Sequence, residues 1–341
     1  MREYPMGSSR PRIVVVGGSF AGLTAVLELK RLLKEQAEIT LLSKQNRFVF
    51  IPSLIWVPFG WREPGDISFD LRPTLERRGI SFIHAAVERI EPEHSQVILQ
   101  DREIPYDYLV IATGPSLEFE AVPGLGPHGG YTQSVCTLDH ALEARKAWVE
   151  FLKDPGPVIV GATQGASCFG AAYEFVFNLE YALRKAKVRD KAPVTFVTAE
   201  PFLAHFGIGG MGKGREMTEW FFRRLKIDGI TNAVVEKVTP GMVHLANGRT
   251  LPFKYAMIIP PFQGVEAIRN SPGIGDARGF VPVTDTYRHP TYPNIYAAGV
   301  AVAVRSPQPT PVPTGVPKTG YVSEVMAKVA AQNIAAAIKG G

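Results

Sequence analysis

The segment Gly161-Ala-Thr-Gln-Gly-Ala-Ser-Cys-Phe-Gly170 decides how the rest of the chain is interpreted. It follows the apolar run Val158-Ile-Val160, which is typical of a buried strand, and it leads into a helical pattern that starts near Tyr173. A glycine-rich turn between a strand and a helix is where a βαβ unit binds a dinucleotide. Because this turn carries Cys168, one of only two cysteines, it indicates a nucleotide fold with a thiol at its ligand site.

A similar turn stands near the amino terminus. The strand-like run Ile13–Val16 ends in Gly17-Gly-Ser-Phe-Ala-Gly22, and the residues after it have helical apolar spacing. Ser19 replaces the middle glycine of the usual fingerprint, but serine is small enough for the backbone to approach a pyrophosphate. The next strand-like run, Ile39–Leu42, is followed by Ser43-Lys44 instead of the acidic residue that binds ribose in NAD folds.

The two turns belong to two similar halves of the chain. After the first turn come a hairpin pattern, Val97–Tyr106, and a strand-like run, Tyr108–Gly114. After the second turn come the hairpin Val243–Phe253, with the turn residues Asn247-Gly248, and the run Tyr255–Ile259. Internal repetition of this kind is hard to obtain by chance.

The repeat predicts an α/β fold with two tandem Rossmann-like domains, the second inserted in the first. We expect an FAD-binding domain in residues 1–120 plus 281–341. Residues 121–280 are expected to form a second domain of the NAD(P)-binding type, which carries the redox cysteine.

Composition narrows the classes of function. The chain has 341 residues, a formal net charge of +5 and no block of basic residues interleaved with aromatic ones, so a nucleic acid partner is not expected. Two cysteines do not make a disulfide scaffold or a zinc site, and we expect no metal. The polar stretch Met1–Arg12 does not resemble a signal peptide, and no apolar run reaches the roughly 18–20 residues of a membrane span.

Several segments together resemble the sulfide:quinone oxidoreductases, which belong to the two-domain flavin disulfide reductases. The segments that carry the resemblance are Ser134–His140, Gly165–Gly170, Glu200–His205, Asn294–Gly299 and Thr310–Tyr321. The similarity covers nearly the whole chain and extends to flavocytochrome c sulfide dehydrogenase and the type II NADH dehydrogenases. Val300 stands where many NADH-using relatives have an aspartate on the ribityl chain.

The resemblance implies that FAD is the cofactor. The residues expected to bind it lie in the first turn, at the ends of later strands and in the segment before the last helix: Gly17, Gly18, Ser19, Phe20, Ala21, Gly22, Ser43, Lys44, Ala112, Thr113, Gly114, Gly299, Thr314, Gly315, Lys318, Thr319 and Gly320.

Cys168 is the first candidate catalytic residue. It lies in a turn that enters a helix, and helix N-terminal amides stabilise anions, so we expect its thiol to ionise more readily than a free thiol. The resemblance implies that Cys168 is a redox cysteine beside the flavin. The alternative is a small buried apolar residue, the commonest role of a single cysteine.

Cys136, His140 and His205 are the other candidates. Cys136 precedes a helix expected from Thr137 to Leu152, and helical spacing would bring His140 back toward it. A thiol beside an imidazole suits proton transfer and persulfide release. The resemblance implies an assisting role for Cys136 and proton-handling roles for the two histidines. The alternative is a helix-capping segment with an incidental histidine.

We therefore expect an FAD-dependent sulfide:quinone oxidoreductase, which oxidises sulfide to zero-valent sulfur or polysulfide and passes the electrons to quinone. The second turn lacks its middle glycine, and Cys168 with Phe169 fills the space of a dinucleotide, so NADH is not expected to bind. The alternatives are an NADH:quinone dehydrogenase of type II, a flavoprotein like flavocytochrome c sulfide dehydrogenase, and a non-catalytic flavin-binding subunit. The resemblance also allows a homo-oligomer.

The carboxyl-terminal end departs from the family pattern. In the family a third cysteine follows the terminal flavin helix and pairs with the counterpart of Cys168, and amphipathic helices that hold quinone at the membrane come next. This chain ends at Gly341 with neither feature. A fragment is the favoured explanation, and a short relative with altered chemistry is the other. We expect a peripheral membrane protein, which would contact an anionic membrane surface through a part absent here.

Overall fold

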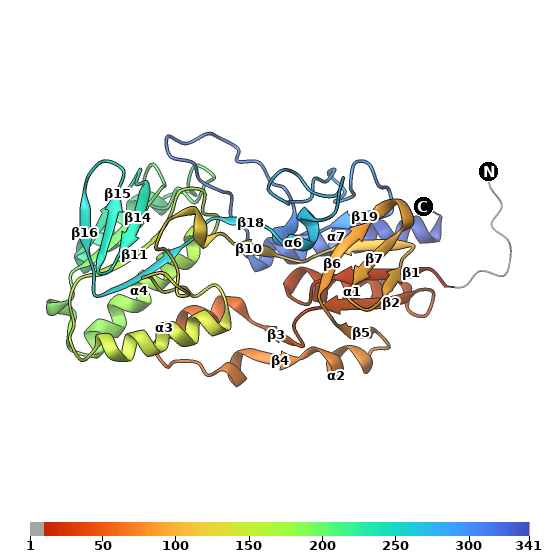
Figure 1. The fold of residues 1–341 in the computed structure, drawn as a ribbon, viewed down its shortest axis with the longest axis horizontal. Coiled ribbons are helices and arrows are strands. Elements are labelled where there is room, and N and C mark those ends of the chain that lie inside the picture. Colours follow the sequence, from red (N-terminus) through yellow and green to blue (C-terminus); the bar gives the residue numbers. More distant parts are fainter. Residues whose placement is uncertain (1–9, 341) are drawn as a thin grey trace.

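The computed structural model describes residues 10–340, and they form two lobes side by side along the long axis (Figure 1). Residues 1–9 and 341, which include most of the stretch considered for a signal peptide, lie outside the described part. The first lobe contains a five-stranded parallel sheet in the order β19-β9-β1-β2-β5. Its strands are β1 (Arg12–Val16), β2 (Glu38–Ser43), β5 (Ser81–His84), β9 (Tyr108–Ile111) and β19 (Ile295–Ala297).

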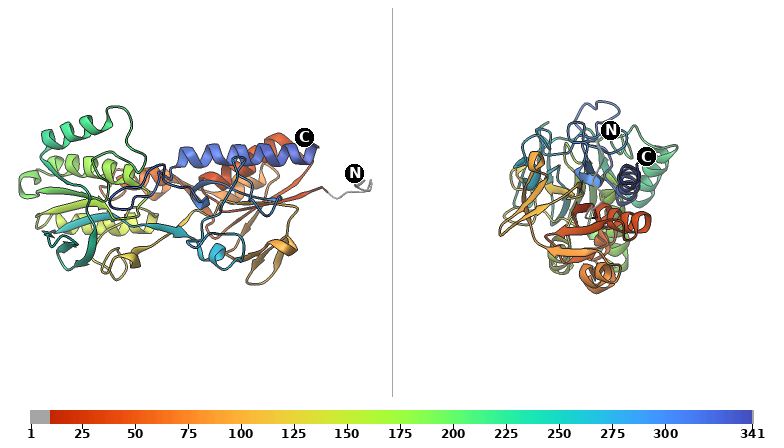
Figure 2. Two further views of the ribbon diagram at one scale, coloured as in Figure 1. Left: turned by 90° about the horizontal axis from the view of Figure 1, so that it is seen from above. Right: turned by 90° about the vertical axis from the view of Figure 1, so that its right-hand side faces the viewer.

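Two long helices pack together on the first sheet, α1 (Phe20–Leu33) and α7 (Gly320–Lys339). The helix α7 runs along one side of the molecule, as Figure 2 shows. Both helices present small or apolar side chains to the sheet, such as Ala25 and Leu29 of α1 and Ala327 and Ala330 of α7, all fully buried. Small residues allow the two helix backbones to approach closely, and burial of the apolar faces stabilises the pair.

The second lobe repeats this plan with a four-stranded parallel sheet in the order β13-β12-β11-β17. Its strands are β11 (Val158–Ala162), β12 (Val194–Thr198), β13 (Ile227–Ile230) and β17 (Tyr255–Ile259). Every residue of β11 and β17 is buried, as expected for a parallel sheet that is covered on both faces. The helices that cover it are α3 (Leu138–Phe151), α4 (Phe169–Lys185) and α5 (Gly214–Leu225).

Each lobe also carries a small antiparallel sheet of three strands. The first consists of β6 (Val87–Glu91), β7 (Gln96–Leu99) and β8 (Glu103–Pro105), and the second of β14 (Val235–Thr239), β15 (Met242–Leu245) and β16 (Thr250–Pro252). Both sheets have a register shift at the same relative place, between Val87 and Arg89 and between Val235 and Lys237. The shared irregularity shows that the sequence repeat is a structural repeat.

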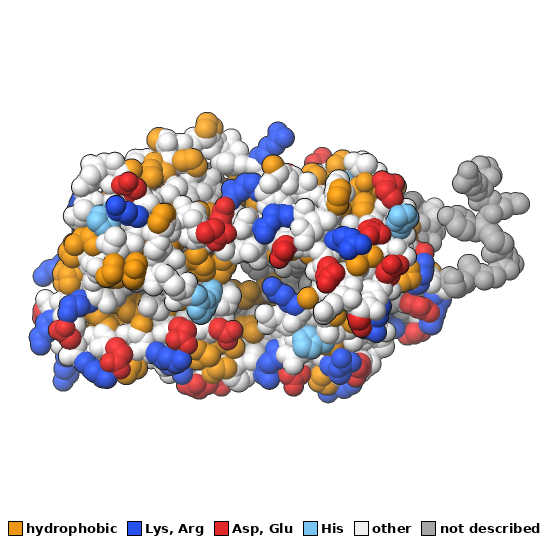
Figure 3. Space-filling view, in the orientation of Figure 1, with side chains coloured by type: hydrophobic (Ala, Val, Ile, Leu, Met, Phe, Trp, Pro, Cys, Tyr) orange, Lys and Arg blue, Asp and Glu red, His pale blue; other side chains and the backbone are white. Residues whose placement is uncertain are grey.

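Two short strands, β10 (Pro115–Leu117) and β18 (Phe262–Gly264), pair antiparallel where the chain passes between the lobes. A hollow opens between the lobes on the face drawn in Figure 3. The remaining short elements are the strands β3 (Arg47–Val49) and β4 (Ser68–Asp70), the helices α2 (Leu71–Glu76) and α6 (Glu266–Arg269), and the 3-10 turns Ile51–Trp56, Pro64–Ile67, Pro92–His94, Phe119–Ala121, Arg189–Lys191 and Gly299–Ala301.

The predicted fold class, two Rossmann-like domains with one inserted in the other, is confirmed. The domain boundaries of 1–120 plus 281–341 and 121–280 stay a prediction. The helix expected near Tyr173 begins earlier, at Phe169, because Phe169, Ala172 and Val176 already form its buried stripe. Among residues 10–340, no helix combines the length and the apolar character that crossing a membrane requires.

Candidate active site

The first glycine turn, Gly17–Gly22, joins β1 to α1 at the carboxyl edge of the first sheet. The Gly17 φ of 115° lies in the region that favours glycine, and a Cβ there would come within 2.1 Å of the Ala112 carbonyl oxygen. A Cβ on Gly22 would come within 1.7 Å of the Gly17 carbonyl oxygen. Within residues 10–340, the amides of Gly18 through Ala21 donate to no carbonyl. The turn therefore offers free donors to an anion.

The ends of the neighbouring strands bring other predicted residues to the same edge. Ser43, at the end of β2, is buried, and its hydroxyl would lie 2.7 Å from a Cβ on Gly18. Gly114, shortly after β9, has a φ of 71°, and a Cβ on it would meet no atom within 4 Å, so it faces open space. A Cβ on Gly299, after β19, would come within 2.9 Å of Ala21. Together with the end of β1, these three strand ends form one continuous edge of the sheet.

The two lysines predicted at this site, Lys44 and Lys318, have different surroundings. Lys44 is exposed. The Lys318 ammonium donates to the carbonyl oxygens of Val300 and Val302 at 3.0 and 3.1 Å, and it lies 3.5 Å from the centre of the Phe280 ring. Burial lowers the pKa of Lys318 to about 8. The Lys318 side chain therefore fastens the segment before α7 to the end of the first sheet.

The segment before α7 continues across to the second lobe, where it covers the second glycine turn. The Gly165 amide donates to the Pro313 carbonyl at 2.7 Å, and the Gly315 amide donates to the Ala166 carbonyl at 2.8 Å. A Cβ on Gly315 would come within 2.1 Å of the Ser167 hydroxyl. Of the other predicted residues here, Thr314 contacts the Thr310 hydroxyl at 3.2 Å, Thr319 is the N-cap of α7, and Gly320 begins that helix.

Gln164 closes the second turn from the other side. Its side-chain amide donates to the Val235 carbonyl and accepts from the Val235 amide, both at 3.0 Å. Sequence reasoning gave Gln164 no role, and a polar residue in a turn carries no pattern that would have revealed one. The backbone donor at Gly165 that would face a pyrophosphate is already used. The second turn is therefore filled by the chain itself.

The structure brings Cys168 close enough to Cys136 to affect the pKa of the Cys136 thiol. Cys168 is the N-cap of α4, and Cys136 lies two residues before α3. Burial raises the pKa of Cys136 to about 12, the Ser134 hydroxyl opposes this shift, and the neighbouring Cys168 adds to it. Both thiols are half-buried and reduced. The sequence placed the two cysteines far apart, and the fold places them at one site.

The expected easy ionisation of Cys168 is wrong for the protein as it stands here. Burial raises the pKa of the Cys168 thiol, and the Glu174 carboxylate adds a smaller effect in the same direction. The Ala171 amide at the helix N-terminus opposes the shift, as expected, but does not outweigh burial. A thiolate at this position needs a further stabilising group or a nearby base.

His140 does not turn toward Cys136 as the helical spacing suggested. Its ring is buried against Phe119 and His128, with ring centres 5.6 and 5.2 Å apart, and no hydrogen bond joins it to Cys136 within residues 10–340. Its backbone amide donates to Thr137, the N-cap of α3, so the helix starts as predicted. Burial, followed by the nearby His128, lowers the pKa of His140. His128 lies in the irregular segment before α3, so helical spacing gave no indication of this pair.

Glu200 and His205 belong to one buried network after β12. The Glu200 carboxylate accepts from the hydroxyls of Tyr173 and Thr198 and from the Phe206 amide, each at 2.7 Å. Burial raises the pKa of Glu200. Glu200 stands where an NADH enzyme has the carboxylate that binds ribose, but here its carboxylate is bonded to groups of the chain itself. The His205 ring accepts from the Gly207 amide at 3.1 Å, and burial lowers the pKa of His205.

Comparison with known proteins identifies the family of this chain. Residues 11–319 match the family model described as pyridine nucleotide-disulphide oxidoreductase. A sulfide-quinone reductase from Aquifex aeolicus (strain VF5) is 42% identical over 332 residues, which cover 94% of this chain and 75% of that protein. The chain belongs to the sulfide:quinone oxidoreductase family. A mitochondrial sulfide:quinone oxidoreductase from Dictyostelium discoideum is 27% identical, and the chain spans 64% of its length.

A structural comparison supports the same family. The X-ray structure of the sulfide:quinone oxidoreductase from Aquifex aeolicus superimposes with a TM-score of 0.93 at 40% identity. The superposition covers 97% of this chain and 77% of that one. The family assigns the chain to the flavin-dependent oxidoreductases.

The first turn of this sulfide:quinone oxidoreductase family member fits a flavin dinucleotide. The free amides at the start of α1 and the two glycines that admit no Cβ make a cradle for a pyrophosphate. The open space at Gly114 lies on the same sheet edge. The second turn does not fit a second dinucleotide, because chain atoms occupy its donor and its space.

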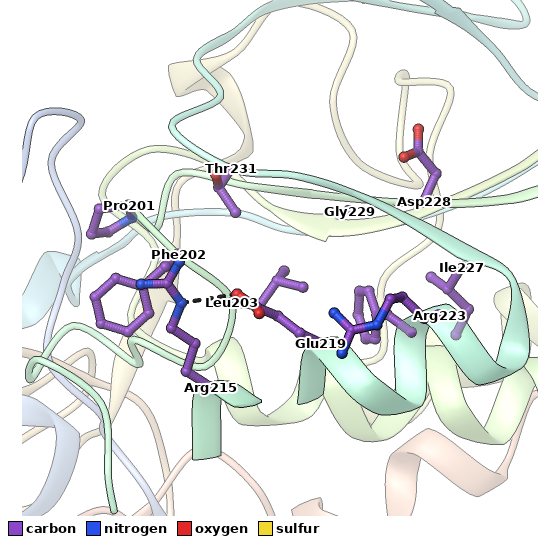
Figure 4. Close-up of a pocket in the computed structure, with 11 residues that line it drawn as sticks. Pro201, Phe202, Leu203, Arg215, Glu219, Arg223, Ile227, Asp228, Gly229 and Thr231 are labelled. Atoms are coloured by element: carbon purple, nitrogen blue, oxygen red, sulfur yellow. Dashed lines mark hydrogen bonds and ion pairs between the residues drawn. The ribbon is translucent and has the colours of Figure 1, made fainter. Parts of the chain in front are cut away.

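A separate groove of about 380 Å³ lies between α5 and β13 (Figure 4). Arg215 and Glu219, which form an ion pair at 2.8 Å, extend from α5 into it, and the Arg215 guanidinium lies 4.9 Å from the centre of the Phe202 ring. Its lining includes none of the predicted site residues. The groove is therefore distinct from the first glycine turn and from the two cysteines.

Proposed function

We propose that this protein is an FAD-dependent sulfide:quinone oxidoreductase, which oxidises sulfide to zero-valent sulfur or polysulfide and passes the electrons to quinone. The observation that carries the proposal is the closed second turn, whose Gly165 amide is bonded to Pro313 and which carries Cys168 close enough to Cys136 to affect its pKa. The similarity to the Aquifex aeolicus sulfide-quinone reductase supports the same reaction.

FAD would be held by the first turn and the strand ends around it. Gly17 and Gly22 would allow the close approach, the free amides of α1 would face the pyrophosphate, and the Ser43 hydroxyl, which accepts from the Gln45 amide, would donate to a ribose. The segment before α7 links this site to the cysteines through Pro313 and Gly315. When bound, FAD supplies a two-electron acceptor and donor between sulfide and quinone.

Burial shifts the pKa values of the two cysteines and of the two candidate histidines, each toward the neutral form. Sulfide that becomes zero-valent sulfur gives up two electrons and its proton. Cys168 is proposed to take up the sulfur and Cys136 to assist its release. Because burial raises the pKa of both thiols, each starts as a protonated thiol at neutral pH. His140 and His205 are the proposed proton-handling residues, and because burial lowers the pKa of both, each would pass a proton on readily but hold it only briefly.

Quinone is a lipid-soluble electron acceptor, so we place the protein at the membrane surface as a peripheral protein. Self-association is compatible with this placement. An NADH-driven reaction is disfavoured, because the Gly165 amide is bonded to Pro313 and the Glu200 carboxylate is buried. A purely flavin-binding role would give no function to Cys168 and Cys136, although the fold brings them near each other.

The test is anaerobic reduction of the fully flavinylated protein by sulfide. We expect the visible flavin band to bleach, and we expect Cys168→Ser to slow the bleaching by roughly 10³-fold or more, because the variant loses the nucleophile. The flavin content of Cys168→Ser should equal that of the unchanged protein. No bleaching of the unchanged protein would sink the sulfide reaction, and fast bleaching by NADH would favour the dehydrogenase.

A further inference from the structure

Five large apolar side chains lie exposed on and just before α5. Their exposed fractions range from 37% to 63%, and we call them the α5 surface: Ile208, Met211, Met217, Trp220 and Phe221. The helix projects from the second lobe at the end of a long connection, as the left view of Figure 2 shows. Contiguous exposed apolar side chains of this size mark an interaction site more often than chance.

The α5 surface is not the face that packs on the lobe. Met217, Trp220 and Phe221 have the spacing of one helical stripe, whereas the neighbouring Phe222 is buried and faces the core. Trp220 and Phe221 lie against each other, with ring centres 4.8 Å apart. The helix therefore has two apolar sides, one toward the protein and one toward solvent.

Positive charge surrounds this apolar stripe. Residues 208–226 contain five basic and two acidic side chains, so this short stretch carries three of the five net positive charges of the chain. Arg215 is paired with Glu219, but Arg223 and Arg224 form no ion pair with any described residue. Arg223 extends into the groove between α5 and β13 (Figure 4), whereas Arg224 has the helical spacing of the stripe itself. An apolar stripe with tryptophan on a helix of net positive charge is the composition of a helix that lies in a lipid headgroup region.

Charge also decides between a bilayer and a second copy of this chain. In a twofold pair the same basic stretch would face itself, and the repulsion would oppose association. An anionic bilayer instead attracts each basic residue and accepts the apolar side chains below its headgroups. The amino-terminal part of α7, with Tyr321 exposed by 77% and Val325 by 41%, lies on the same side of the molecule (Figure 2).

We propose that the α5 surface, with its basic border, binds an anionic phospholipid bilayer. The inference extends the membrane association in the proposed function, and it assigns that association to residues on the second lobe. Bilayer contact there would hold the protein against the compartment in which quinone dissolves. Lipid binding needs no turnover, so its test and the sulfide test fail independently.

The test uses sedimentation of the flavin-loaded protein with vesicles of phosphatidylcholine and phosphatidylglycerol in equal amounts. We expect the unchanged protein to bind these vesicles and to bind pure phosphatidylcholine at least tenfold more weakly. The double variant Trp220→Ser/Phe221→Ser should bind the mixed vesicles at least tenfold more weakly. Arg223→Glu/Arg224→Glu should lose binding by a similar factor and lose its salt dependence.

Val149→Ser is the matched control, since Val149 is an apolar residue with 53% exposure on α3, away from α5 (Figure 2). It should bind the vesicles as the unchanged protein does. All variants should keep the unchanged flavin content and melting temperature. Unaltered vesicle binding by the Trp220→Ser/Phe221→Ser protein would overturn the proposal. So would a concentration-dependent dimer that this variant abolishes, because the occupant would then be a second copy.

Discussion

The two glycine turns both join a parallel strand to a helix, but the first leaves its amides free for a ligand and the second bonds its amide within the chain. In the first turn, three residues separate β1 from α1, and the helix amides are left without carbonyl partners in the described chain. In the second turn, six residues separate β11 from α4, and the chain bonds its own donor at Gly165 to Pro313. The extra residues include Cys168. A nucleotide cradle thus becomes a thiol site when chain atoms occupy its donors.

Both turns nevertheless need a glycine at the end of the preceding strand, because a neighbouring strand leaves no room for a Cβ there. A Cβ on Gly17 would meet the Ala112 carbonyl at 2.1 Å, and a Cβ on Gly161 would meet the Val197 carbonyl at 2.0 Å. Both glycines therefore serve the close approach of neighbouring strands. What differs is the space beyond them, so a glycine at this position indicates the fold but not the ligand.

Gly17→Ala should produce the largest effect, loss of flavin binding. The added Cβ would collide with the Ala112 carbonyl, and the φ of 115° would strain any side chain. We expect the affinity for flavin to fall by more than about 100-fold, equivalent to about 3 kcal/mol. The ratio of absorbance at the flavin band to that of the protein, measured after reconstitution, checks this.

Gly170→Ala is the matched change at the second turn. A Cβ at Gly170 meets nothing within 4 Å, and its φ is not positive. This variant should keep its full flavin content. If Gly17→Ala also kept it, with an unchanged circular dichroism spectrum, the first turn would not be the flavin cradle.

Gln164→Ala should have an intermediate effect, on stability. It removes both hydrogen bonds to Val235 and leaves a backbone amide and carbonyl without their partner. We expect the free energy of unfolding to fall by about 1–3 kcal/mol, measured by urea denaturation. Substitution of the exposed Gln36 by Ala should change it little. NADH should still fail to reduce the flavin of Gln164→Ala, because the Gly165 bond to Pro313 remains.

The smallest expected effect is that of His205 on the pH dependence of the free energy of unfolding. Burial lowers the pKa of His205, so the folded state binds this proton less readily than the unfolded state does. The stabilisation is present above the usual pKa of about 6.5 and is lost as the pH falls through the lowered folded value. Protonation also removes the lone pair that accepts from the Gly207 amide.

His205→Gln should therefore lose less stability than the unchanged protein between pH 7 and pH 5. The free energy of unfolding of the unchanged protein should fall more steeply over this range than that of His205→Gln. Gln36→Ala, which changes an exposed residue that carries no charge, is the control and should leave the slope unaltered. An equal slope for His205→Gln and the unchanged protein would contradict the role of buried His205.

Much of the fold could be predicted from the sequence, because it rests on local patterns. Buried apolar runs, two glycine turns and a repeated hairpin identify two Rossmann-like units. The start of α3 after Thr137 also follows from local capping chemistry. The start of α4 at Phe169 was missed, because Gly170 makes the first turn of that helix resemble loop.

The site was only partly predictable from the sequence. Residue type and turn position indicated Cys168 and the cradle at Gly17–Gly22. The contact of His140 with His128, and the engagement of the Lys318 ammonium by two carbonyls, join segments that no spacing relates. The functional roles of the predicted residues stay predictions until the variants are measured.

The sequence by itself determined the two-unit fold, the thiol in the second turn and the glycines that strand packing requires. These features follow from sterics and hydrophobic periodicity over a few residues. Only the tertiary structure decided that the second turn is closed, that Cys136 neighbours Cys168 and that burial raises the pKa of both thiols. Desolvation and donor occupancy depend on which distant segments pack at a site, and short-range patterns do not contain that information.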